Sequence, residues 1–204
     1  MSSVKQQTDF VLSIYPVRVT VGELKKWITK DDETSKQHIT EFIYHRINHR
    51  YIEPLLHVSP QKYRSGFLMM ASACLMIETL QSFYTGKKET PRGQGLNSFK
   101  DFFQREVKFF PSFAAEFRDD KDNFYTNIRC GILHQAETKR GYRILRVGPL
   151  LDTTARTVNA EAFLKALERC LDHYVSELRA ARPESELWKN AVRKLNFISD
   201  NCKH

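Results

Sequence analysis

Apolar residues recur every three or four positions along most of this chain, and this spacing predicts a mainly helical protein. The first long helix is expected from Ser35, as its N-cap, to about His57. A second is expected from about Pro60 to Tyr84, because proline is favoured in the first turn of a helix. Apolar residues nearly encircle this second helix, which is typical of the central helix of a bundle. Further helices are predicted over residues 98–110, 120–137, 159–180 and 183–201.

The N-terminal segment has a different pattern. Residues 8–20 are rich in Val, Ile, Tyr and Thr and contain a proline, which predicts an edge strand or an extended arm. Thr20 and Glu23 have the spacing of a capping box, which predicts a short helix to about Thr29. A charged linker follows. The expected organisation is an N-terminal arm or appendage over residues 1–35 and one helical domain over residues 36–204.

Two further stretches interrupt the helices. Residues 85–97 hold three glycines and a proline between basic residues, which predicts a loop. Residues 142–158 alternate apolar with polar residues around Gly148 and Pro149, which predicts a small β-hairpin inserted into the helical domain.

Composition favours a compact basic protein. The chain has 204 residues, a hydrophobic share of 41% and a formal net charge of +8. Positive charge spread along the chain favours contact with polyanions such as nucleic acid. The four cysteines are far apart and form no C-x-x-C pair, which indicates free thiols in a reducing compartment (Cys74, Cys130, Cys170 and Cys202).

Nothing in the sequence pattern indicates a membrane. The most apolar run, residues 67–80, is interrupted by Ser72 and Glu78, and no segment approaches the roughly 20 apolar residues that cross a bilayer. The first residues are polar and lack the apolar region of a signal peptide. We therefore expect a cytoplasmic protein with no membrane partner.

The segment Asn127-Ile-Arg-Cys-Gly-Ile-Leu-His-Gln135 combines an arginine and a histidine in one predicted helix. Arginine is a permanent cation whose planar fork of donors suits phosphate. Histidine can give or take a proton near neutral pH. Arg129 and His134 could therefore act together on a phosphodiester without a metal ion.

This Arg-x4-His spacing, on a late helix of a helical domain, resembles the HEPN family, whose active members are mostly ribonucleases. The resemblance covers roughly residues 35–180 and includes the long paired helices and the apolar second helix that ends in Ile77-Glu-Thr-Leu-Gln-Ser-Phe83. It implies an antiparallel HEPN-like bundle, no cofactor, and an active site at a homodimer interface. One departure is Cys130, where the family often has Asn, Asp or His. A thiol is a weak hydrogen-bond partner, so we expect a looser hold on the arginine.

On an ideal helix Arg129 and His134 lie about 140° apart. We therefore expect them not to converge on one atom within a single chain, and a twofold partner helix would bring two Arg–His sets into one cleft. His134 would take the proton of a ribose 2′-hydroxyl, and Arg129 would hold the phosphate oxygens. Products would be a 2′,3′-cyclic phosphate and a 5′-hydroxyl.

Other residues could support this chemistry. Glu78, an acid in an apolar helix, could orient Arg129 or His134, since a lone buried carboxylate is costly. Asn127 is a weaker supporting candidate. Basic and aromatic residues after the motif could follow an RNA backbone and stack on a base (Lys139, Arg140, Tyr142, Arg143 and Arg146). So could the basic residues of the glycine-rich loop (Lys87, Lys88 and Arg92).

Two rival interpretations remain open. The first is a non-catalytic HEPN-like module that binds RNA, a nucleotide or a partner protein. The second is a helical metalloenzyme that uses Glu41, His45 and His49, which lie on one helix face. The ribonuclease interpretation leads, with a role as a toxin or defence effector and with an antitoxin or sensor protein as a candidate partner.

Overall fold

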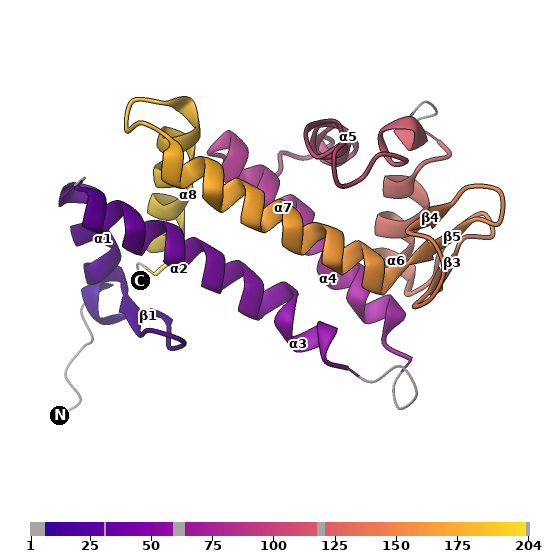
Figure 1. Ribbon diagram of the computed structural model, residues 1–204, viewed down its shortest axis with the longest axis horizontal. Coiled ribbons are helices and arrows are strands. Elements are labelled where there is room, and N and C mark those ends of the chain that lie inside the picture. Colours follow the sequence, from indigo (N-terminus) through magenta and orange to yellow (C-terminus); the bar gives the residue numbers. More distant parts are fainter. Residues whose placement is uncertain (1–6, 31, 59–63, 118–120, 203–204) are drawn as a thin grey trace. The chain divides into compact units, whose positions relative to one another are not determined.

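The computed structural model describes residues 7–30, 32–58, 64–117 and 121–202, and it is mainly helical as predicted (Figure 1). The chain divides into two compact units. Unit 1 comprises residues 1–47, 82–89 and 172–204, and unit 2 comprises residues 48–81 and 90–171. The N-terminal segment is thus grouped with the C-terminal one rather than being set apart at residue 35.

Unit 1 begins with a short helix η1 (Gln7–Asp9), a two-stranded antiparallel sheet and helix α1 (Val21–Lys30). The strands are β1 (Val11–Ser13) and β2 (Val19–Thr20), which confirms the extended N-terminal segment. Helix α1 contacts α8 (Glu186–Asp200) near the C-terminus, which explains why the two ends of the chain belong to one unit.

The helix starts of unit 1 depend on polar caps. Thr20 and Glu23 form the predicted capping box: the Thr20 N–H donates to Glu23 Oε2 at 2.7 Å, and the Glu23 N–H donates to Thr20 Oγ1 at 3.2 Å. Helix α2 (Glu33–Tyr51) is capped by Asp32, whose Oδ1 accepts from the Ser35 N–H at 2.7 Å. The prediction of Ser35 as N-cap was therefore wrong, because the carboxylate three residues earlier takes this role.

Unit 2 contains the remaining elements. After α2 come α3 (Glu53–Leu56), the first part of α4 (Gly66–Thr85) and α5 (Gly95–Arg105). Then come η2 (Ala114–Phe117), a π-helical turn η3 (Tyr125–Arg129), α6 (Cys130–Gln135) and the larger part of α7 (Ala160–Ala180). The helices differ in their ends from those expected: the first stops at Tyr51, α5 begins at Gly95 rather than Ser98, and α8 begins after a Ser185 cap. The expected starts at Pro60 and Asp120 lie outside the described residues.

The predicted hairpin after α6 is a three-stranded sheet with strand order β3-β5-β4. Strands β3 (Arg143–Leu145) and β5 (Thr157–Asn159) are parallel, whereas β4 (Leu151–Asp152) pairs with β5 in antiparallel fashion. Gly148 and Pro149 lead from β3 across to β4, and the tight turn is the later one, between β4 and β5. Asn159 then caps α7 at the start of the helix predicted there, since its Oδ1 accepts from the N–H groups of Glu161 and Ala162.

Phenylalanine forms the core of unit 2. The rings are almost completely buried and lie in contact, with centroids 5.0 Å apart for Phe103–Phe113 and 5.3 Å for Phe124–Phe163. Each such side chain contributes about 1.5–3 kcal/mol when fully buried. Phe124 directly precedes the π-helical turn, so this core fixes where that turn begins.

Helix α4 is long and apolar enough, by length and composition, to cross a membrane, and 67% of its most apolar stretch is buried. The expectation that no segment reaches this length was therefore wrong. Buried core helices of proteins that cross no membrane have the same length and composition, so these two properties do not distinguish a core helix from a membrane-spanning one.

We expect Thr20→Ala to lower the free energy of unfolding by about 1 kcal/mol, because the capping box loses its hydroxyl. The hydrogen bonds from Thr20 hold the pKa of Glu23 below its ordinary value. A lowered folded pKa gives stability above the ordinary glutamate pKa and loses it as the pH falls through the folded value. The difference between wild type and variant, measured by denaturant unfolding, should therefore shrink in acid. Thr29→Ala, at the exposed end of the same helix, serves as the control and should have little effect.

Candidate functional site

The predicted site lies in unit 2, at the π-helical turn that carries Arg129. The Cys130 N–H donates to the Tyr125 carbonyl, five residues back, which closes the wider turn. Asn123 supports the entrance, since its Oδ1 accepts from the Thr126 N–H at 2.9 Å. π-helical turns are rare and are frequently found at functional sites.

Glu78 of α4 holds the arginine. Nε and Nη2 of Arg129 both donate to Glu78 Oε1, at 2.9 and 2.7 Å. The two side chains are only 19% and 24% exposed, so each partly buried charge needs the other. The predicted orienting role of Glu78 agrees with this contact.

His134 meets Arg129 from the other side. Arg129 Nη1 lies 3.2 Å from His134 Nε2, and His134 is exposed. The expectation that the two side chains cannot converge within one chain was therefore wrong. The 140° separation applies to the Cα–Cβ directions, whereas the long arginine side chain bends across the helix surface to reach the imidazole.

The arginine keeps donors for a further ligand. Burial lowers the pKa of Arg129, but the hydrogen bonds and charge of Glu78 more than offset this, so the guanidinium pKa lies above its ordinary value. A guanidinium has five N–H bonds. Among the described residues, Glu78 takes two and His134 takes one, which leaves two for an incoming anion.

Tyr125 is a site residue that the sequence interpretation missed. Its ring lies 5.4 Å from the Arg129 guanidinium and packs against Phe99, with ring centroids 5.2 Å apart. Burial raises the pKa of its phenol. The i, i+4 spacing of a tyrosine and an arginine on one helix was the signal that could have identified this pair.

Cys130 and Asn127 do not contact the Arg129–His134 pair. Cys130 is among the groups that raise the pKa of the Tyr125 phenol, so the thiol lies close to that tyrosine. Asn127 is buried, and its Nδ2 donates to Asp122 Oδ1 at 2.7 Å. The backbone carbonyl of Asn127 accepts a hydrogen bond from the Lys139 N–H. Its role is to tie the following loop to the π-helical turn.

The predicted RNA-contacting residues fall into two groups. Arg140 and Arg156 lie 3.5 and 3.2 Å from Asp122 Oδ2 and are 48% and 40% exposed. With exposed Arg143 and half-buried Lys139 they form a basic surface, which we call the Asp122 patch. Arg156 was not among the predicted residues.

The second group is internal. Tyr142 is buried, with Arg156 over its ring at 5.7 Å, so it has no face for a base. Arg146 donates to the Val58 carbonyl, to Ser65 and to Glu161, and its side chain is largely buried. The expected RNA contact through Tyr142 and Arg146 does not fit this burial.

Lys87, Lys88 and Arg92 are exposed in the loop before α5.

The alternative metal site has no geometric support. Within the described residues, no group of three His, Cys, Asp or Glu side chains could hold a metal ion. His49 pairs with Glu53, and Glu41 accepts from Gln37 at 2.9 Å. His49 and Glu41 thus each contact a residue four positions away in the sequence.

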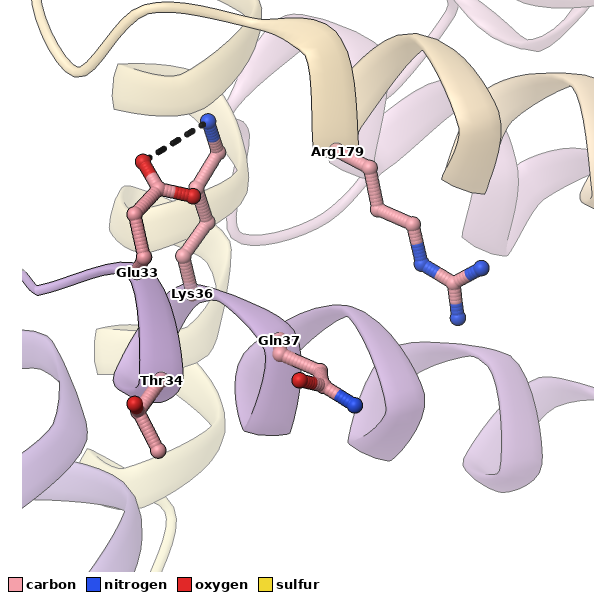
Figure 2. Close-up of a pocket in the computed structure, with 5 residues that line it drawn as sticks. All are labelled: Glu33, Thr34, Lys36, Gln37 and Arg179. Atoms are coloured by element: carbon pink, nitrogen blue, oxygen red, sulfur yellow. Dashed lines mark ion pairs between the residues drawn. The ribbon is translucent and has the colours of Figure 1, made fainter.

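A shallow hollow of about 430 Å³ in unit 1 lies where α2 begins and α7 ends (Figure 2). Its lysine is already used: Lys36 Nζ donates to the Ala181 carbonyl at 2.6 Å and lies 3.9 Å from Glu33. The Arg179 guanidinium lies apart from this pair and donates to Thr40 at 3.4 Å. The cations of the hollow are thus already paired with groups of the chain, and the carboxylate beside them, Glu33, is the partner of Lys36.

Comparison of the chain with protein-family models, with curated protein sequences and with solved structures finds no match. The geometry of unit 2 is therefore the basis for the functional proposal.

We expect Gly131→Ala to displace the segment that follows α6. A Cβ on Gly131 would lie 2.4 Å from the Glu137 carbonyl oxygen, a backbone atom that cannot rotate away. The clash should cost about 1–3 kcal/mol of unfolding free energy, measured by thermal or denaturant unfolding. Ala136→Gly is the matched control: Ala136 has a φ of 56°, which glycine adopts without strain, so stability should be kept or raised. An unchanged stability of Gly131→Ala would contradict the close approach.

Proposed function

We propose that this protein is a metal-independent endoribonuclease with a HEPN-like arrangement of helices. The observation that carries the proposal is the 3.2 Å contact between Arg129 Nη1 and His134 Nε2, with Glu78 fixing the arginine from behind. A phosphate-binding cation and a proton acceptor thus meet at an exposed edge of unit 2.

In the proposed mechanism His134 is a neutral imidazole. A guanidinium can only donate, so the contact is a hydrogen bond when His134 Nε2 carries a lone pair and the ring proton is on Nδ1. That neutral imidazole is the form that accepts a proton. In the reaction, Nε2 would take the 2′-hydroxyl proton while the oxygen attacks the adjacent phosphorus.

Arg129 would bind the scissile phosphate through its two remaining N–H bonds. When the phosphate binds, the Nη1 donor that meets His134 would turn to a phosphate oxygen while Glu78 keeps Nε and Nη2, and this frees the Nε2 lone pair to take the proton. As attack proceeds, negative charge grows on the phosphate oxygens and the arginine stabilises it. Cleavage yields a 2′,3′-cyclic phosphate and a 5′-hydroxyl.

The leaving 5′-oxygen needs a proton donor, and we propose that a second copy of the chain supplies it. One protomer brings one His134 to the site, so a partner's motif or a water molecule must supply the acid. The active homodimer in this proposal therefore serves acid catalysis, and it is not needed to bring arginine and histidine together.

Substrate contacts are assigned to the Asp122 patch. Its arginines outnumber the carboxylate that holds them, and exposed ion pairs of this kind add little stability. The patch is bonded to the same π-helical turn as Arg129 through Asn127, so a bound RNA backbone would be held in register with the reacting phosphate. We further propose a cytoplasmic toxin or defence role with a restraining partner protein.

The alternative is a non-catalytic HEPN-like module that binds RNA, a nucleotide or a partner protein. The thiol of Cys130, a weak hydrogen-bond partner at the position after the arginine, favours it. In that case Arg129 and His134 would only bind phosphate.

The deciding experiment is cleavage of a labelled structured RNA and a tRNA pool in EDTA. We expect wild-type protein to leave cyclic phosphate ends, and His134→Ala to reduce the rate at least 100-fold, because a general base contributes about 10²–10⁴. Glu78→Gln keeps the shape but weakens the hold on Arg129, and an intermediate loss is expected.

His173→Ala is the matched control. Like His134, this histidine lies on a helix and contacts a charged side chain, here Glu177, but it belongs to unit 1. It should cleave like wild type. If folded wild-type protein cleaves nothing but binds RNA, the binding module is the better description. Cleavage that survives His134→Ala would reject the assignment of the base.

Phosphate contact through the Asp122 patch predicts a change in salt dependence. In a His134→Ala background, which cannot cleave, Arg140→Ala with Arg156→Ala should lower the slope of log affinity against log salt by about 1–2. The measurement is RNA binding by fluorescence anisotropy between low and moderate salt. Arg182→Ala with Lys189→Ala removes the same charge from exposed positions of unit 1 and should leave the slope nearly unchanged.

A further inference from the structure

A second, smaller cavity lies in unit 1, between the β1–β2 hairpin and one face of α1 and α2. Its volume is about 210 Å³. Val19 and Phe42 are buried and form its floor, whereas Tyr15 and Val17 of the hairpin are exposed around it. A volume below the range of about 300–1,000 Å³ found for drug-sized ligands suits a single ring system.

The walls are aromatic. Trp27 of α1 stacks on His38 of α2, with ring centroids 4.9 Å apart and planes 29° from parallel. Tyr15 and Phe42 add two more rings. Stacking surfaces of this kind bind nucleobases, because every base has a π-face.

The polar groups of the cavity come mostly from one row along α2. His38, Glu41 and His45 follow one another at three and four residues, so they face the hairpin together. Two of them belong to the set that the sequence suggested as metal ligands. Their side chains contribute a carboxylate and two imidazole rings to the lining of this cavity.

Charge distinguishes a base from a cationic side chain. Arg46 already lies over the Phe42 ring at 5.7 Å and donates to the Leu12 carbonyl at 2.8 Å. The chain thus already supplies a cation to this aromatic ring. Arg18, between the lining residues Val17 and Val19, is exposed and adds positive charge suited to a phosphate outside the cavity.

We propose that this cavity binds a nucleobase, with the ribose and phosphate outside, and that guanine is preferred. Guanine presents two adjacent N–H donors on its Watson–Crick edge, which one carboxylate can accept together. Glu41 provides that carboxylate, since a single hydrogen bond from Gln37 to Oε1 leaves acceptor positions on both oxygens. The base can belong to a free nucleotide or to an RNA chain.

Binding of a base in this cavity can be measured through the fluorescence of Trp27. The chain has two tryptophans, so Trp188→Phe leaves Trp27 as the only one. We expect GMP to quench its fluorescence in a saturable way, with AMP and UMP about tenfold weaker, because adenine and uracil lack the two adjacent N–H donors that the carboxylate would accept. Ribose 5-phosphate alone should not quench.

Glu41→Gln should weaken GMP binding at least tenfold, whereas Glu33→Gln, on the same helix but outside this cavity, should not. Repeating the titration in a His134→Ala background with a short guanine-containing RNA separates the two sources of the base: tighter binding of the RNA than of GMP assigns the site to RNA. Because no arm depends on cleavage, a failed ribonuclease assay leaves this test intact. Absence of quenching by any nucleotide in folded protein, equal binding by Glu41→Gln, or displacement by an arginine-containing peptide alone would overturn the proposal.

Discussion

The ion pair between Arg129 and Glu78 is the interaction on which the geometry of the candidate site depends most directly. It joins α4 to a helical turn 51 residues later in the sequence and fixes the orientation of the guanidinium. A partly exposed pair contributes only about 1 kcal/mol to stability, so its main effect is on position. With two of its donors fixed by Glu78, the arginine can reach His134 and still keep N–H bonds for an anion.

The basic residues are connected to the same π-helical turn by hydrogen bonds and ion pairs. The loop after α6 returns to the π-helical turn through the Lys139–Asn127 hydrogen bond, and Arg140 and Arg156 both meet Asp122. Arg140 and Arg156 adopt positive φ angles of 51° and 50°, which side-chain-bearing residues rarely do. Strained residues of this kind persist where the surroundings determine them, and here the shared carboxylate and neighbouring hydrogen bonds supply that support.

The sequence predicted the helices better than it predicted their contacts. Spacing of apolar residues revealed nearly every helix, and the capping box at Thr20 was correct because it depends only on local chemistry. The helix starts at Asp32 and Gln94 were missed, because several polar residues near each start could serve as a cap. Residue types identified Arg129, His134 and Glu78. Their convergence could not be predicted, since it depends on side-chain reach and on a tertiary partner. The burial of Tyr142 and Arg146 could not be predicted for the same reason, because it depends on contacts with residues far away in the sequence.

The π-helical turn has a further consequence for how this region can change. A π-helical turn holds about one residue more than an α-helical turn, so it accommodates an extra residue while the helix after it keeps its orientation. Loss of one residue between Tyr125 and Arg129 would therefore close an ordinary α-helical turn and leave α6 in nearly the same rotation about its axis. Arg129 and His134, which lie at and after the end of the turn, would stay together, whereas the wider turn that ends at the Tyr125 carbonyl would be lost. The chain can thus change its local length here by one residue without separating the two side chains.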